Sequence, residues 1–124
     1  MKRILLAAAA CLTTAAPALA APGDMSVAAF LTKADALKAK GAMAMFSPDL
    51  KVLQGEGKAA GDAYRARLKA ERAAGRPSSC PPANARISSD ELLAHLRTYP
   101  AAARPRTSIK QAMADYFSRK YPCR

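Results

Sequence analysis

The sequence predicts an all-α fold: a small four-helix domain with one disulfide, preceded by a signal peptide. Alanine-rich stretches carry apolar residues at helical spacing and are separated by glycine and proline. Stretches in which Val, Ile or Thr alternate with polar residues, as is typical of β-strands, are missing. Only two cysteines, Cys80 and Cys123, lie beyond the predicted leader, which matches a single disulfide.

Residues 1–20 have the organisation of a signal peptide, with a positive start, an apolar run and small residues at the cleavage site. Ala18 and Ala20 occupy the positions that a signal peptidase reads, so cleavage is expected before Ala21. The apolar run is shorter than the roughly 20 residues of a membrane-spanning helix, so no transmembrane segment is expected. A lipoprotein leader with Cys11 as the modified residue is the alternative, but the leucine preferred before such cysteines is missing. We therefore expect a periplasmic or secreted protein.

The processed chain, residues 21–124, is long enough for a single domain with one core. Two of the 20 Lys and Arg residues lie in the leader and all nine acids lie beyond it, which leaves a formal charge of +9. This excess favours acidic partners and says nothing about the fold. The charges are scattered, and no run reaches the roughly five or six like charges that mark a binding tail.

Export would place Cys80 and Cys123 in an oxidising compartment, where they are expected to pair. In the chain-entropy model, a disulfide that closes a loop of this length stabilises the fold by roughly 4 kcal/mol. Two free thiols or a metal pair are the alternatives. A metal pair is a poor rival, because the chain has one histidine and no CxxC motif.

Capping signals predict the first helix and the connector that follows it. Ser26 can cap a helix that runs to about Lys40, where Gly41 ends it. Residues 42–46 then form a short apolar connector, and we expect its large apolar side chains to be buried. These side chains are Met43, Met45 and Phe46.

Ser47 and Pro48 start a long second helix that continues to about Ala74. Three glycines interrupt its interior, and each costs up to about 1 kcal/mol relative to alanine. They indicate either a bend or frayed region, or the close approach of another helix. The sequence leaves both alternatives open for Gly55, Gly57 and Gly61.

Ser88 and Glu91 form a capping box that opens a third helix, which ends near Tyr99 because Pro100 follows. Thr107 or Ser108 starts a fourth helix. Its apolar face comprises Ile109, Ala112, Met113, Tyr116 and Phe117.

Catalytic chemistry is scarce in this sequence. His95 is the single histidine, and it follows Glu91 by four residues, so a pair on the helix surface is the economical interpretation. No nucleophile motif such as GxSxG is present, and a disulfide would leave no free thiolate. We therefore expect no enzyme, no cofactor and no metal site. Most aromatic residues fall on predicted core stripes, so nucleic acid is not expected as a partner either.

The C-terminal part of the chain resembles the Rap/Tai immunity proteins. Ser79-Cys80-Pro81-Pro82 is followed by the capped third helix, Tyr99-Pro100, a further helix and the terminal Tyr121-Pro122-Cys123. The resemblance is best over residues 78–123 and extends more loosely to the long helix, through Gly61 and Tyr64. This chain differs from better-known members in its high positive charge and in lacking an additional cysteine before the long helix.

The resemblance implies a periplasmic protein that binds and inhibits a cell-wall amidase delivered by type VI secretion, by occluding its active-site cleft. Its partner would be a secreted amidase toxin, and such proteins often form homodimers. The resemblance also implies that Cys80 and Cys123 are the motif cysteines. The implied framework positions are Pro82, Tyr99, Pro100 and Pro122.

An inhibitor needs a rigid surface that is ordered before contact. We therefore propose two loops as partner-binding candidates, residues 80–86 with Arg86, and the loop with Arg104 and Arg106. Arginines there could pair with acidic groups at the rim of a cleft. An ordinary solvated connection is the alternative for each loop. Two other function classes also stay open: a periplasmic holdase chaperone, and a basic envelope-associated binding protein.

Overall fold

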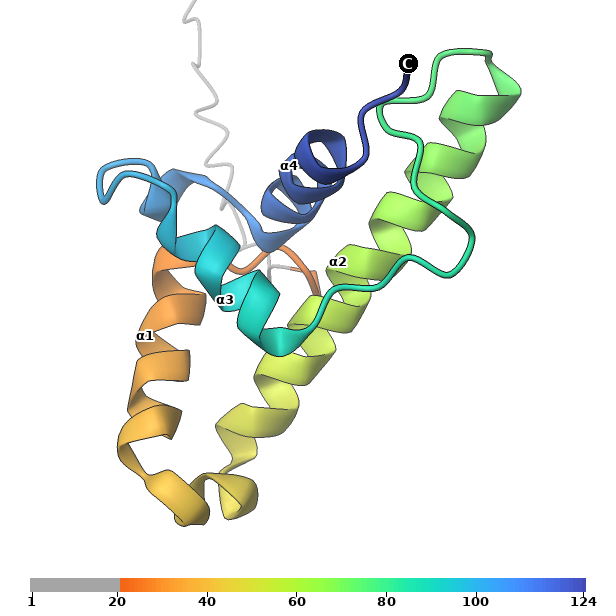
Figure 1. Cartoon of the computed structure of the whole chain (residues 1–124). Coiled ribbons are helices and arrows are strands. Elements are labelled where there is room, and N and C mark those ends of the chain that lie inside the picture. Colours follow the sequence, from red (N-terminus) through yellow and green to blue (C-terminus); the bar gives the residue numbers. More distant parts are fainter. Residues whose placement is uncertain (1–20) are drawn as a thin grey trace, which may run out of the picture.

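The computed structural model describes residues 21–124, which form four α-helices and two 3₁₀-helices (Figure 1). Within these residues there is no strand, only an isolated bridge between Ser26 and Ser108, so the all-α prediction is confirmed. The predicted signal peptide and Cys11 lie outside the described residues. In chain order the elements are α1 (Val27–Ala39), η1 (Gly41–Phe46), α2 (Pro48–Ala73), α3 (Ser89–Arg97), η2 (Arg104–Arg106) and α4 (Ile109–Lys120).

Helices α1 and α2 form a V whose point is η1, and α3 and α4 lie between its arms (Figure 1). The point is built by local signals. Gly41 has a φ of 58°, a left-handed conformation that glycine adopts without strain and that ends α1. Ser47 then caps α2 by accepting a hydrogen bond from the Asp49 amide, and Pro48 occupies the first turn, as predicted.

The far end of α2 closes with a Schellman motif. Gly75 has a φ of 73°, its amide donates to the Arg72 carbonyl at 3.0 Å, and the Arg76 amide donates to the Glu71 carbonyl at 2.9 Å. The predicted stop after Ala74 is therefore confirmed. Helix α2 runs unbroken from the point of the V to Ala73.

The shorter helices α3 and α4 begin as the capping signals predict. Ser88 and Glu91 form the capping box of α3, with each side chain accepting a hydrogen bond from the other residue's amide. Ser108 caps α4 through the Gln111 amide at 3.1 Å. These two local signals place the helices that complete the core.

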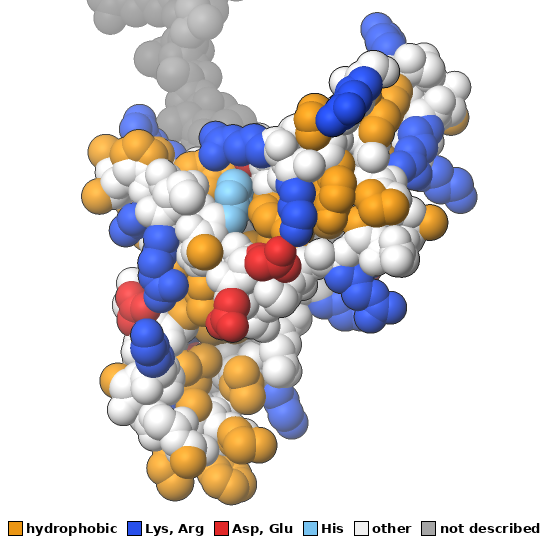
Figure 2. All heavy atoms as spheres, viewed as in Figure 1, with side chains coloured by type: hydrophobic (Ala, Val, Ile, Leu, Met, Phe, Trp, Pro, Cys, Tyr) orange, Lys and Arg blue, Asp and Glu red, His pale blue; other side chains and the backbone are white. Residues whose placement is uncertain are grey.

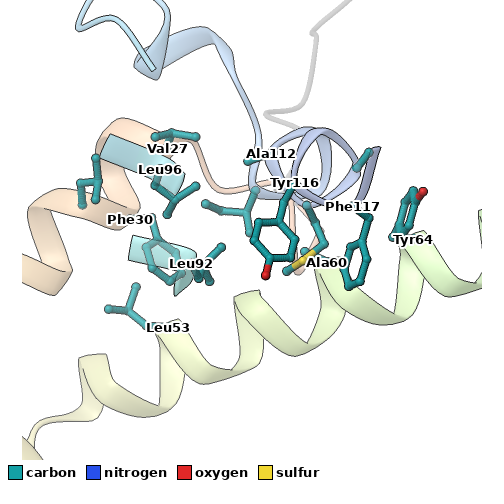
Figure 3. Close-up of a cluster of buried hydrophobic side chains, with 14 of the residues drawn as sticks. Val27, Phe30, Leu53, Ala60, Tyr64, Leu92, Leu96, Ala112, Tyr116 and Phe117 are labelled. Atoms are coloured by element: carbon teal, nitrogen blue, oxygen red, sulfur yellow. The ribbon is translucent and has the colours of Figure 1, made fainter. Parts of the chain in front are cut away.

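All four α-helices contribute to one hydrophobic core (Figure 3). Every residue of the predicted apolar face of α4 is buried, and Phe117 stacks on Tyr64 of α2 with ring centroids 5.2 Å apart. None of the helices formed by residues 21–124 is long and apolar enough to cross a bilayer. The least exposed members of the core are Val27, Ala60, Leu96, Ile109, Ala112 and Met113.

The beginning of the described chain is tied to α2 and α4. The Glu56 carboxylate accepts hydrogen bonds from the Gly23 amide at 2.6 Å and the Met25 amide at 3.3 Å. The Met25 carbonyl in turn accepts from the Ile109 amide at 2.9 Å. These bonds hold residues 23–25 against α2 and the start of α4.

The predicted disulfide joins Cys80 and Cys123, whose Cα atoms lie 5.0 Å apart. It closes a segment with a sequence separation of 43 and ties the C-terminus to the loop after α2. Free thiols and a metal pair are thereby set aside for these two cysteines.

One burial prediction is wrong. Met43, Met45 and Phe46 are exposed by 66%, 78% and 81%, not buried. Among the described elements, η1 contacts only α1 and α2, so α3 and α4 do not reach far enough to cover it. The side chains therefore point away from the core at the tip of the V (Figure 2).

Candidate functional site

An open groove of about 840 Å³ lies between α2, α3 and the segment that leads into α3. Its floor is apolar, and Figure 3 shows Phe30, Leu53 and Leu92 meeting there from three different helices. The segment 83–89 forms one wall. A concave, largely apolar surface with polar groups at its edge is typical of a binding site.

Two of the three interior glycines of α2, Gly57 and Gly61, line this groove. An added Cβ at Gly61 would meet no atom within 4 Å, and one at Gly57 would meet only the Leu92 side chain at 3.9 Å. Of the two alternatives that the sequence left open, close approach of another helix is therefore excluded. The helix is also continuous through all three positions. The missing side chains leave the groove floor open at Gly57 and Gly61, whereas Gly55 lies outside the groove.

The base of the groove wall is fixed by buried hydrogen bonds and by the disulfide. The Tyr64 hydroxyl bonds with the hydroxyls of Ser78, at 3.0 Å, and of Ser79, whose side chain is fully buried. The Cys80 amide donates to the Tyr121 carbonyl at 2.7 Å, next to the disulfide. This segment is thus ordered by tertiary contacts before any partner arrives.

Glu71 adds a further tie to the same segment. Its carboxylate accepts from the Ser78 amide at 3.1 Å and from the Ser78 hydroxyl. These bonds, together with Arg67 at 3.0 Å, hold the pKa of Glu71 below its ordinary value. The tie is therefore charged, and stable, at neutral pH.

Basic side chains line the edge of the groove. Lys58 and Arg65 both pair with Asp62, and the hydrogen bond from Lys58 is the main cause that lowers the pKa of this carboxyl. Arg86 on the wall is exposed, and no carboxylate of the described residues lies within 4.0 Å of it. Arg86 is thus the cation of this edge that is available to a partner.

The second predicted loop has a different character. The Arg104 guanidinium donates to the carbonyls of Tyr99 and Arg97, both at 2.9 Å, so it braces the turn between α3 and η2. Arg106 is exposed on η2. Neither residue lines the groove, so the structure does not bring the three candidate arginines together.

The implied framework residues lie in turns around these elements. Tyr99 is half-buried and donates its hydroxyl proton to Asp115, and burial, followed by this bond, raises the pKa of Tyr99. The carbonyl of Pro100 accepts from the Ala103 amide at 2.9 Å and starts the turn to η2. The carbonyl of Pro82 accepts from the Ala85 amide at 3.0 Å within the groove wall, and Pro122 is exposed beside Cys123.

His95 does not pair with Glu91, and the prediction of a surface pair is wrong. His95 is buried, and its Nε2–H donates to the Ala112 carbonyl of α4 at 2.8 Å. Burial, the leading cause, lowers the pKa of His95, so the ring is neutral at physiological pH. Its edge contacts with Tyr99 and Tyr116, at centroid distances of 5.4 and 5.6 Å, make it a packing residue of the α3–α4 contact.

Glu91 faces Lys120 instead, at 2.8 Å, and also accepts from the Ser88 amide. These hydrogen bonds lower the pKa of Glu91 to about 2. Among residues 21–124, no group of three or more His, Cys, Asp or Glu side chains is placed to hold a metal ion.

No family model, curated protein or solved structure matches this chain. The resemblance to the Rap/Tai proteins therefore stands on the motif residues alone. The sequence predicted the disulfide, which is confirmed, and named Arg86, which the structure places at the groove, but it missed the groove and the exposed tip. Gly57 and Gly61, one turn apart on α2, were the only sequence signal for the groove.

Proposed function

We propose that this chain is an immunity-type binding protein of the cell envelope, which inhibits a cell-wall amidase by occluding its active-site cleft. The proposal rests on the resemblance of residues 78–123 and on one structural observation. The segment 78–80, which leads into the groove wall, is fixed in advance by the Cys80–Cys123 disulfide and by the buried Tyr64–Ser79 hydrogen bond. A preordered surface loses little conformational entropy on binding, which is what a tight inhibitor requires.

In this proposal the groove and its wall together contact the partner. A segment at the rim of the amidase cleft lies along the apolar floor, while Arg86 pairs with an acidic group of the partner. The excess positive charge of the chain increases the rate of encounter with an acidic rim. Apolar burial provides affinity, and Arg86 provides orientation.

The first test compares two leucine substitutions on α2. Gly61→Leu places a side chain in the groove, and Gly55→Leu places the same side chain outside it. Secreted hydrolases encoded beside this gene are expressed, and inhibition of peptidoglycan cleavage is measured. We expect the unmodified protein and Gly55→Leu to inhibit equally, and Gly61→Leu to inhibit about tenfold less well or worse. Equal inhibition by all three proteins would contradict the groove as the contact surface.

The second test separates the two loops by association rate. Arg86→Ala removes the cation of the groove wall, and Arg106→Ala removes an exposed cation of η2 with the same change in charge. At low ionic strength, stopped-flow mixing with the amidase is expected to show slower association for Arg86→Ala only. A slower rate for Arg106→Ala alone would move the contact to the η2 loop.

A further inference from the structure

The tip of the V carries exposed apolar side chains that the groove does not use. Met43, Met45 and Phe46 of η1 are the most exposed large apolar residues of the described chain, and Val52 on the first turns of α2 is 44% exposed. They gather at the end of the molecule where α1 and α2 meet (Figure 2). Contiguous exposed apolar side chains of this size are typical of a contact surface.

Because the tip projects from the molecule, it is suited to insert into an apolar layer. Figure 1 shows that η1 is the outermost turn at the point of the V, and its large apolar side chains are mostly exposed and do not line the groove. The Met43 amide donates to the Lys40 carbonyl at 3.2 Å, and the Ser47 amide donates to the Ala44 carbonyl at 3.0 Å. These amides are satisfied within the turn and need no water when the tip enters an apolar layer.

The charges around the tip identify the kind of surface. Lys38, Lys40 and Lys51 are exposed beside η1, and within the described residues none lies within 4.0 Å of a carboxylate. The nearest acid in the sequence, Asp49, already pairs with Lys33 at 3.1 Å. Exposed apolar side chains with exposed lysines close to them in the sequence fit the boundary between acyl chains and anionic headgroups.

We propose that the η1 tip, with Met43, Met45 and Phe46 inserted and Lys38, Lys40 and Lys51 at headgroup level, docks the protein on an anionic phospholipid surface. This function is separate from the groove. With the tip in the lipid, the disulfide end of α2 points away from the surface, because the two lie at opposite ends of one helix (Figure 1). The groove then stays open to a soluble partner.

The most direct test uses the absence of tryptophan from the sequence. Phe46→Trp places a single fluorophore at the tip, and Ala73→Trp places one at an exposed position at the other end of α2. Each protein is mixed with vesicles of phosphatidylglycerol and phosphatidylcholine, or with vesicles of phosphatidylcholine alone. We expect a blue shift of the emission for Phe46→Trp on the anionic vesicles only, and no shift for Ala73→Trp. A shift for Ala73→Trp alone, or for neither protein, would overturn the proposal.

Matched charge variants separate the tip from the overall positive charge. Lys38→Gln with Lys51→Gln removes two cations at the tip, and Arg72→Gln with Arg76→Gln removes two at the far end of α2. In vesicle co-sedimentation, the tip pair should weaken partition by about fivefold per lysine, and the far pair by much less. Equal losses would show that general charge attraction causes the binding.

A combined variant, Met43→Ser with Met45→Ser and Phe46→Ser, distinguishes lipid from other occupants. Its three changes are at exposed positions, so the fold is retained, which circular dichroism checks. We expect the variant to lose vesicle binding. If it instead loses self-association in light scattering, or loses protection of an unfolding client protein, while the unmodified protein ignores vesicles, the tip binds protein and the lipid proposal is overturned.

Discussion

The two ends of helix α2 differ in how they are held. At the C-terminal end, the Tyr64–Ser79 and Glu71–Ser78 hydrogen bonds hold the loop that follows the helix, and the disulfide ties this loop to the C-terminus. At the N-terminal end, η1 is held by short-range turns, and its apolar side chains face outward. The comparison shows that one helix can present two surfaces of different character. One end presents a fixed polar loop, and the other presents an adaptable apolar tip.

The largest expected effect comes from breaking the tied end. Replacing Cys80 and Cys123 together by Ser should lower the free energy of unfolding by about 4 kcal/mol, since the loop they close is no longer restricted in the unfolded chain. Urea denaturation followed by circular dichroism measures the change. A loss below about 1 kcal/mol would mean that the hydrogen bonds alone hold this end.

Removing the Tyr64 hydroxyl, at the same end of α2, should have a smaller effect on the free energy of unfolding. Tyr64→Phe removes the hydroxyl that bonds with Ser78 and with the buried Ser79, and should cost about 1–3 kcal/mol. Tyr116→Phe is the matched control, because its hydroxyl bonds only with the exposed Lys120. Similar unfolding free energies for the two variants would contradict the role assigned to the buried bond.

The parts of the fold that depend on neighbouring residues or on the number of cysteines could be predicted from the sequence. Helix ends depend on neighbouring residues, so the signals at Ser26, Ser47-Pro48 and Ser88 with Glu91 were sufficient. The disulfide followed from the count of cysteines. His95 could not be placed in this way, because its burial depends on α4, whose Ala112 carbonyl lies 17 residues away.

The exposed tip and the groove could not be predicted from the sequence, because both depend on contacts between distant elements. An apolar stretch indicates burial only if a core lies within reach, and η1 lies beyond α3 and α4. The groove likewise depends on where segment 83–89 settles against α2. Its glycines were noticed, but no local pattern states whether a neighbour fills the space beside them.

His95, in the core between the two ends of α2, should make the free energy of unfolding depend on pH. Because the pKa of His95 is lowered in the folded state, the unfolded chain binds more protons, and stability should fall as the pH drops below about 6.5. His95→Gln should flatten this part of the profile. Unfolding free energies measured across the range test it, and an unchanged slope in the variant would contradict a buried, neutral His95.

The smallest effect is expected at the tip. Phe46→Ser should change the free energy of unfolding by no more than about 0.5 kcal/mol, because the side chain is 81% exposed. Thermal unfolding of this variant beside Tyr64→Phe gives the comparison directly. A loss comparable to that of Tyr64→Phe would place Phe46 in the core after all.

Amide hydrogen exchange, resolved by peptide mass spectrometry, tests the central claim that the segment leading into the groove wall is ordered before a partner binds. In the free protein, the Cys80 amide, bonded to the Tyr121 carbonyl, should exchange slowly, and the η1 amides should exchange fast. Reduction of the disulfide should abolish the protection at Cys80 and leave η1 unchanged. Fast exchange at Cys80 in the oxidised protein, equal to that of η1, would contradict the account.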